Sequence, residues 1–296
     1  MKKKQSKKRK KGNDNLKLVY LFIAIVIALT GILFFIAGPE DHSERPLVAT
    51  QRPGKVLEAT LPQTAESQAD EPTIISSLPK LAVIIDDIGF NKRFTDLLDI
   101  QVPLTLAIIP FTPYSREAAT KGHTAGLEVM LHLPMEPKGY PASNPGQGAL
   151  LTTMSENDIL NQTIADLNDV PNIKGVNNHM GSSFTEYSKG MKIVLKEIKK
   201  RNLFFVDSKT SIHSTGYSLA KAMNIRTAER HVFLDNVQTE EAITQQLLEA
   251  VKVAKDKGEA VAIGHPYPST VIVLRKLAPH LKEEGVELVL ASALVK

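Results

Sequence analysis

Residues 78–296 consist of apolar runs of four to seven residues that alternate with amphipathic stretches, and this alternation limits the possible folds more than any other feature. Strands that alternate with helices predict βαβ units and a parallel sheet. We predict strands at residues 81–85, 104–109, 127–133, 175–177, 203–206, 232–234, 260–263 and 286–290, and helices at residues 157–167, 191–201, 239–257 and 270–284. Seven or eight such units are enough for one α/β barrel around one core, and an open doubly wound sheet is the alternative.

An uncharged apolar segment at residues 18–38 precedes this domain. Its length of about 21 residues matches the roughly 20 that cross the hydrocarbon core of a membrane as a helix. A cleaved signal peptide, which is the alternative, usually has a shorter apolar region and a small-x-small cleavage site. We therefore predict an uncleaved, single-pass transmembrane anchor.

The residues on either side of this segment predict its orientation. Residues 1–17 hold nine Lys and Arg and one acidic residue, and such basic tails stay on the cytoplasmic side. Residues 39–77 are rich in Pro, Glu, Gln, Thr, Ser and Ala, which predicts a disordered linker. The domain at residues 78–296 is accordingly expected outside the cytoplasm, and the absence of cysteine agrees with an oxidising compartment.

The basic tail also accounts for the positive net charge of the chain. The formal charge is +4, from 36 basic and 32 acidic residues, but residues 18–296 carry 27 basic and 31 acidic residues, a net of −4. A basic tail beside a membrane segment serves topology and contact with anionic lipid. We expect no nucleic-acid partner for the folded part.

Acids and histidines stand at the ends of five of the predicted apolar runs. They are Asp86 and Asp87, His132 with Glu136 close behind it, His179, Asp207, and His265. In parallel sheets the functional residues lie at the carboxyl ends of the strands. We therefore predict that these Asp, His and Glu side chains line one opening, the mouth, at the carboxyl edge of the sheet.

The first two of these groups suggest a metal site. Of two adjacent carboxylates, Asp86 and Asp87, one can bind a metal while the other takes a proton, although one of them could instead cap a helix. His132 and Glu136 could face one ion through nitrogen and oxygen, which suits zinc or a similar divalent metal. A histidine after a buried strand can also be a hydrogen-bonded structural residue.

The later groups leave several roles open. The polar neighbours of His179 could fix its tautomer or form a turn. Asp207 could orient a histidine or cap a helix, and His265, held by Pro266, could be an exposed general acid. The Pro- and Gly-rich loop at residues 134–152 is expected to cover the site. The sequence has no Gly-x-Ser-x-Gly nucleophile elbow and no Gly-rich phosphate loop. These absences disfavour a serine hydrolase and a nucleotide-binding protein.

Taken together, these segments resemble those of the divergent polysaccharide deacetylases, a branch of the NodB-like deacetylase superfamily. The similarity is carried by Ile85-Asp86-Asp87-Ile88-Gly89, Leu131-His132-Leu133-Pro134-Met135-Glu136-Pro137, Asn178-His179-Met180-Gly181-Ser182, Phe205-Val206-Asp207-Ser208 and Gly264-His265-Pro266. The resemblance implies a distorted (β/α) barrel of seven to eight strands. It also implies a divalent metal, with zinc expected, and removal of acetyl groups from an N-acetylated carbohydrate or cell-wall glycan.

The resemblance also implies roles for individual residues. Asp86 corresponds to the catalytic base, Asp87 to a metal ligand and His265 to the general acid. The superfamily's His-x-x-x-His metal motif falls on His132 and Glu136, so its second position is a departure, and His179 is expected to supply the missing nitrogen ligand. We place Asp207 in the catalytic set. The superfamily's Arg-Pro-Tyr segment has no clear match.

Two alternatives to a deacetylase stay open at this point. One is a barrel of the same fold that binds a glycan or an envelope partner without turnover, which the Glu136 departure favours. The other is a hydrolase of a different bond, such as a phosphoester, because the fold does not fix the function.

Overall fold

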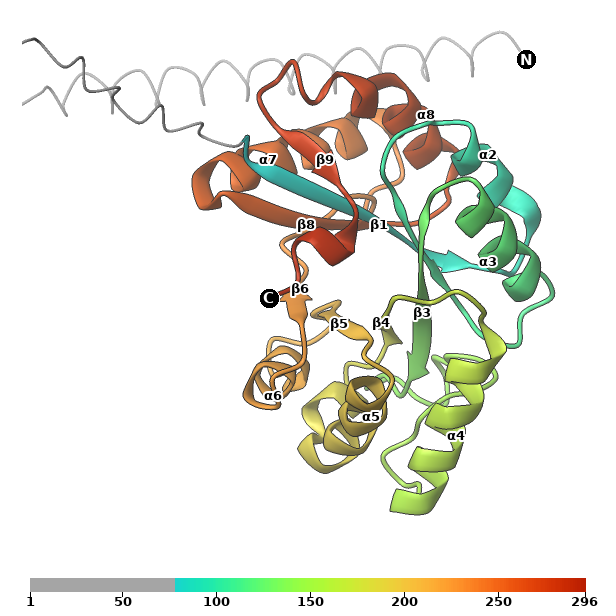
Figure 1. Cartoon of the computed structure of the whole chain (residues 1–296). Coiled ribbons are helices and arrows are strands. Elements are labelled where there is room, and N and C mark those ends of the chain that lie inside the picture. The colour runs from blue at the N-terminus through green and yellow to red at the C-terminus, as the bar shows by residue number, and fades with distance from the viewer. Residues whose placement is uncertain (1–77) are drawn as a thin grey trace, which may run out of the picture. The chain divides into compact units, whose positions relative to one another are not determined.

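The computed structural model describes residues 78–296, which form a curled sheet of parallel strands with helices around its outside (Figure 1). The predicted tail at 1–17, transmembrane segment at 18–38 and linker at 39–77 lie outside the described residues. Within the described part, no helix is long and apolar enough to span a bilayer.

The sheet of the described residues has nine strands, against the seven to eight expected, and every strand pair is parallel, as predicted. They are β1 (Lys80–Ile88), β2 (Thr105–Ile108), β3 (Glu128–Met135), β4 (Gly175–Met180), β5 (Phe204–Asp207), β6 (Thr227–Glu229), β7 (Val232–Phe233), β8 (Glu259–Gly264) and β9 (Glu287–Val289). Eight strands follow the order β6-β5-β4-β3-β2-β1-β8-β7. Among the described residues no ladder joins β6 to β7, so the sheet is an incomplete barrel.

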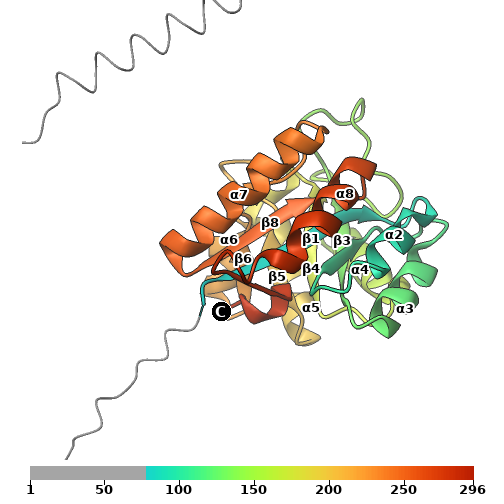
Figure 2. The same ribbon diagram turned by 90° about the horizontal axis from the view of Figure 1, so that it is seen from above.

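The helices connect successive strands and lie around the curled sheet in both views (Figures 1 and 2). They are α2 (Thr95–Leu98), α3 (Ser115–Thr124), α4 (Glu156–Asp169), α5 (Ser188–Lys200), α6 (Gly216–Ala222), α7 (Glu240–Lys257) and α8 (Pro268–Leu277). Ser155 and Thr239 cap α4 and α7 by accepting the backbone N–H three residues on. The predicted helix at 270–284 is shorter than expected, because Pro279 cannot continue the α-helical ladder and a 3₁₀ turn follows.

The strands bury both of their faces, which explains why they read as continuous apolar runs. In β1, Leu81, Val83 and Ile85 belong to the core between the sheet and the helices. The alternate residues Ala82 and Ile84 belong to a second core inside the curl. The period of two along the strand thus divides one apolar run between two cores.

The amino end of the curled sheet is closed by the segment that follows β9. The backbone N–H of Ala291 donates to Thr105 Oγ1 at 3.1 Å, and that of Ser292 donates to a Glu128 carboxylate oxygen at 3.0 Å. Lys296 then pairs with Thr227 at the start of β6. The carboxyl ends of the strands lie at the opposite end, and they carry the candidate site.

Candidate metal and catalytic site

A bulge at the end of β1 brings both carboxylates of the Asp86-Asp87 pair into the site. The pairing register with β2 shifts between Ile85 and Ile88, so β1 holds one extra residue there. Asp87 has a φ of 58°, a left-handed conformation that is uncommon for a residue other than glycine. In a regular strand these neighbours would point to opposite faces. The local geometry instead leaves Asp86 buried and Asp87 beside it at the mouth.

Asp87, His132 and His179 come together from β1, β3 and β4. One potential ligand atom from each lies within 4.8 Å of the others, which makes a group that can hold a metal ion. Asp87 Oδ1 is 3.3 Å from His132 Nε2 and 2.9 Å from His179 Nδ1. The two imidazole nitrogens are 3.2 Å apart.

The donor set fits a divalent metal. Asp87 Oδ1 is buried and makes no hydrogen bond of good geometry, although two ring nitrogens lie beside it. Burial acts to raise the pKa of Asp87, but His132 and His179 outweigh it and hold that pKa far below its usual range. An ionised oxygen and two converging nitrogens are the ligands that structural surveys associate with zinc and related ions.

Asn177 on β4 links His132 to Asp86. Its side-chain amide donates to Asp86 Oδ1 at 2.8 Å and to Ser208 Oγ at 3.3 Å. Its amide oxygen lies 2.8 Å from His132 Nδ1, so that nitrogen carries the proton and Nε2 is free to face Asp87. This is the supporting hydrogen bond that metal-binding histidines usually have. The sequence suggested that the polar neighbours of His179 either fix its tautomer or form a turn, and in the structure one of them, Asn177, contacts His132 instead.

Asp86 has the properties of a proton acceptor. It is 3 % exposed, and one of its carboxylate oxygens lies 3.5 Å from His132 Nε2. Burial raises the pKa of Asp86, against the lowering effects of His132 and His265. A raised pKa brings a carboxylate closer to neutral pH, where a general base works well.

His265 directly follows β8 and has the properties of a proton donor. Its Nδ1 lies 2.9 Å from Asp235 Oδ1, and its Nε2 lies 3.7 Å from Asp87 Oδ2. Burial alone would lower the pKa of His265, but the bond to Asp235 and the charge of Asp86 raise it to about 8. Asp235 is itself held by Thr270 Oγ1, which donates at 2.8 Å. The imidazole is therefore protonated at neutral pH and fixed in orientation.

Asp235 was not among the residues predicted from the sequence. It follows the apolar run at residues 232–234, in the same way that the predicted site residues follow theirs. The strand at 232–234 was predicted, so the position of Asp235 directly after it already indicated a place at the carboxyl edge of the sheet; β7 itself has only two residues.

Glu136 and Asp207 are placed in supporting roles outside the group around Asp87. Glu136 accepts the backbone N–H and hydroxyl of Thr152, which ties the end of the 134–152 loop to β3. Asp207 accepts the hydroxyl of Ser214 at 2.6 Å and the backbone N–H of Tyr217 at 3.0 Å, which caps α6. We therefore remove Glu136 from the expected ligand set and Asp207 from the expected catalytic set.

Comparisons with known proteins identify the family of this chain. Residues 83–295 match the sequence model described as divergent polysaccharide deacetylase. The uncharacterized protein YibQ of Escherichia coli K12 is 36% identical over 217 residues, which are 73% of this chain and 67% of that protein. An uncharacterized protein of Haemophilus influenzae is 33% identical over 206 residues, 69% of this chain and 73% of its own.

A solved structure supports the same assignment. The crystal structure of the uncharacterized protein ATU2773 from Agrobacterium tumefaciens C58 superposes with a TM-score of 0.72 at 25% identity, over 76% of this chain and 92% of that one. The family match covers most of the chain, and it includes every residue of the site described above. The chain belongs to the divergent polysaccharide deacetylase family.

Proposed function

We propose that the protein is a metal-dependent hydrolase that removes acetyl groups from an N-acetylated polysaccharide of the cell envelope. The observation that carries the proposal is the convergence of Asp87, His132 and His179, with buried Asp86 on one side and the His265–Asp235 pair on the other. The family membership supports a carbohydrate substrate. Zinc is the ion that we assign, because two nitrogens and one carboxylate oxygen suit it.

Each side chain then has a definite task in amide hydrolysis. Asp87, His132 and His179 hold the metal, and a metal bound there supplies Lewis acidity that polarises a carbonyl and lowers the pKa of water. Asp86 accepts the proton of the attacking water. His265 Nε2 donates a proton to the leaving amine nitrogen, and Asp235 keeps that imidazole protonated and oriented.

The direct test measures metal content and acetate release on the same preparations. Purified wild type is expected to hold about one metal per chain and to release acetate from N-acetylated oligosaccharides. His132→Ala and His179→Ala should lose metal and activity together. His280→Ala is the matched control, because that side chain is exposed and pairs with an exposed Glu283 carboxylate at 3.4 Å. Unchanged metal content in both site variants would refute the ligand assignment.

The same test separates the competing functions. Metal without acetate release from any N-acetylated oligosaccharide would favour a barrel that binds glycan without turnover. Release of phosphate from a phosphoester substrate, lost in His132→Ala, would favour the other hydrolase class.

We further propose that residues 18–38 anchor the protein in a membrane with residues 78–296 outside the cytoplasm. The nine basic residues ahead of an uncharged apolar run support this orientation. Protease added to spheroplasts should then cleave within residues 39–77 and release the domain. Protection of the domain until the membrane is lysed would reverse the orientation.

A further inference from the structure

A cavity of about 620 Å³ lies at the amino ends of the strands, away from the site at their carboxyl ends. Residues of the turns before β3, β4, β5 and β6 line it, and Leu290 and Ser292 of the closing segment complete it. It lies where the sheet divides, because β1 pairs with β9 along its amino half and with β2 along its carboxyl half. Its volume is within the range of pockets that hold small organic ligands.

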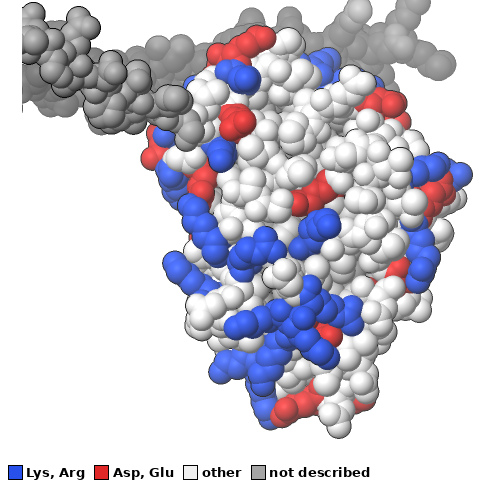
Figure 3. All heavy atoms as spheres, viewed as in Figure 1, with Lys and Arg blue, Asp and Glu red and all other residues white. Residues whose placement is uncertain are grey.

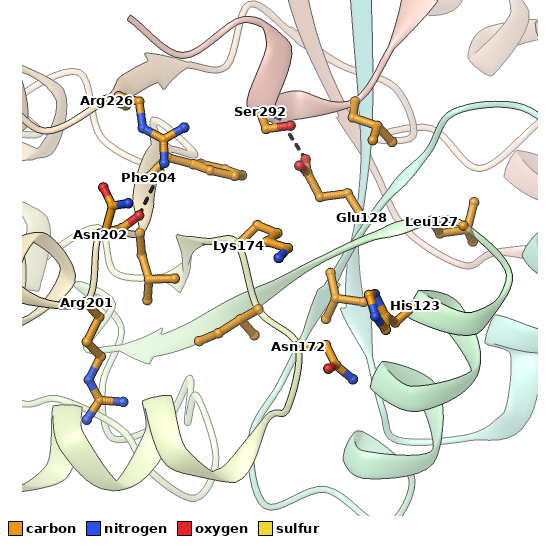
Figure 4. Close-up of a pocket in the computed structure, with 15 residues that line it drawn as sticks. His123, Leu127, Glu128, Asn172, Lys174, Arg201, Asn202, Phe204, Arg226 and Ser292 are labelled. Atoms are coloured by element: carbon orange, nitrogen blue, oxygen red, sulfur yellow. Dashed lines mark hydrogen bonds between the residues drawn. The ribbon is translucent and has the colours of Figure 1, made fainter.

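The cavity has an apolar floor and a basic rim. Partly exposed Ile173, Leu203 and Leu290 supply apolar surface to the floor, and Leu127, Val129 and Phe204 are buried. Figure 4 shows Lys174 in the middle of the opening, with Arg226 on one side and His123 on the other. Such a combination suits a ligand that has an anionic group attached to an apolar body.

Two of the rim cations have no acidic partner in the described part of the chain. No carboxylate there lies within 4.0 Å of the Lys174 ammonium or of the Arg226 guanidinium, whose hydrogen bond goes to the backbone oxygen of Asn202. Arg201, by contrast, is paired with Glu197 at 3.0 Å. The carboxylate inside the cavity, Glu128, is occupied by the closing segment and by Thr105.

The charge distribution of the domain strengthens this point. Residues 78–296 contain 24 basic and 24 acidic residues, so the domain is formally neutral. Figure 3 nevertheless shows Lys and Arg gathered over the face that carries this opening, with few acids among them. A neutral domain that concentrates cations on one face attracts anions to that face.

The geometry points to a second ligand site in this cavity, which binds an organic anion through Lys174 and Arg226 and holds its apolar part against Leu203 and Leu290. The anionic group is a phosphate or carboxylate, since these accept hydrogen bonds from ammonium and guanidinium groups. The site is independent of the proposed hydrolase function.

The test is calorimetric titration of the full chain in neutral detergent with phenyl phosphate, which joins a phosphate to an apolar ring. We expect one site per chain, with weaker binding of inorganic phosphate and of phenol. Lys174→Gln combined with Arg226→Gln should weaken phenyl phosphate binding about tenfold or more, because two charge-assisted hydrogen bonds are lost at a partly exposed site.

Lys252→Gln combined with Lys282→Gln is the control for net charge, since both lysines are exposed and lie outside the cavity lining. The site would be overturned by any of three results. Phenyl phosphate binding could weaken equally in both double variants, it could be equal in wild type and the Lys174/Arg226 variant, or wild type could fail to bind phenyl phosphate. Dodecyl phosphate added to the micelles distinguishes the ligand's source. If dodecyl phosphate displaces phenyl phosphate from wild type but not from the Lys174/Arg226 variant, the ligand is a lipid headgroup. If phenyl phosphate binds and dodecyl phosphate does not displace it, the ligand is a soluble anion.

Discussion

Asp166 on α4 is a buried carboxyl whose replacement should stabilise the protein in a pH-dependent way. The residue is 0 % exposed, and its Oδ1 accepts from Gln162 Nε2 at 2.9 Å. Its Oδ2 has no hydrogen-bond partner, and the backbone of Gly148 packs so closely that a Cβ there would lie 2.5 Å from Oδ1. Burial, with a smaller contribution from the charge of Asp169, raises the pKa of Asp166 to about 8.

The sign and size of the effect follow from linkage between protonation and folding. The folded-state pKa lies above the unfolded value of 3.8, so the neutral acid favours the folded state. The contribution of protonated Asp166 to the free energy of unfolding is fully present at low pH and is lost as the pH rises toward 8. Each unit of pH in this window costs about 1.4 kcal/mol, or about 4 kcal/mol between pH 5 and pH 8. Local relaxation around the carboxylate reduces this to about 2 kcal/mol.

Asp166→Asn removes the titration while it keeps the shape of the side chain. Urea unfolding of wild type and variant between pH 5 and pH 8 should show that the variant gains stability relative to wild type by about 2 kcal/mol across this range. Asp256→Asn is the control, because Asp256 is exposed on α7. If the difference between Asp166→Asn and wild type stays constant with pH, then Asp166 does not titrate in this window and the reasoning is refuted.

Three further results are expected. His265→Ala should lower the rate of acetate release about 10²–10⁴-fold with metal content unchanged, and full activity would remove His265 from the mechanism. Asp235→Asn should lower the pKa of His265 below about 8. Because the general acid must be protonated, the alkaline fall in kcat should then move to lower pH, and an unmoved fall would assign it to another group. Gly89→Ala should lower the free energy of unfolding by roughly 2–3 kcal/mol in urea titrations, because Gly89 has a φ of 125° and a Cβ would lie 2.1 Å from Thr112 Oγ1. Gly126→Ala should lower the free energy of unfolding less, because a Cβ there would lie in open space. Equal losses in the two variants would assign the effect to backbone conformation alone.

The sequence predicted the sheet well because its strands are buried on both faces and read as apolar runs. All eight predicted strands are present and parallel. The strand that we missed, β6 (Thr227–Glu229), has three residues and no apolar run. Its place at one end of the sheet gives it a single strand neighbour, so burial imposes little pattern on it.

The site was predicted in part, for a reason visible at Asp207 and His179. Both follow apolar strands, yet only His179 reaches Asp87, while Asp207 caps α6. The same residue types serve as ligands, caps and loop anchors, and only the backbone direction past the strand decides between these roles. The bulge in β1 sets this backbone direction at Asp87 and turns its side chain toward the histidines, and no pattern in the sequence predicts the bulge.

The pairing of β1 has a consequence for how the domain folds. β1 is the first strand of the described domain, yet it pairs with β8 along Lys80–Ile85 and with β9 along Lys80–Ala82. The centre of the sheet is therefore assembled from segments about 200 residues apart in the chain, a high contact order that slows folding. During synthesis, which runs from the amino to the carboxyl end, the apolar residues of β1 lack two of their partner strands, β8 and β9, until residues 259–289 have been made. During that interval the nascent domain depends on pairing with β2, or on a chaperone, to avoid aggregation.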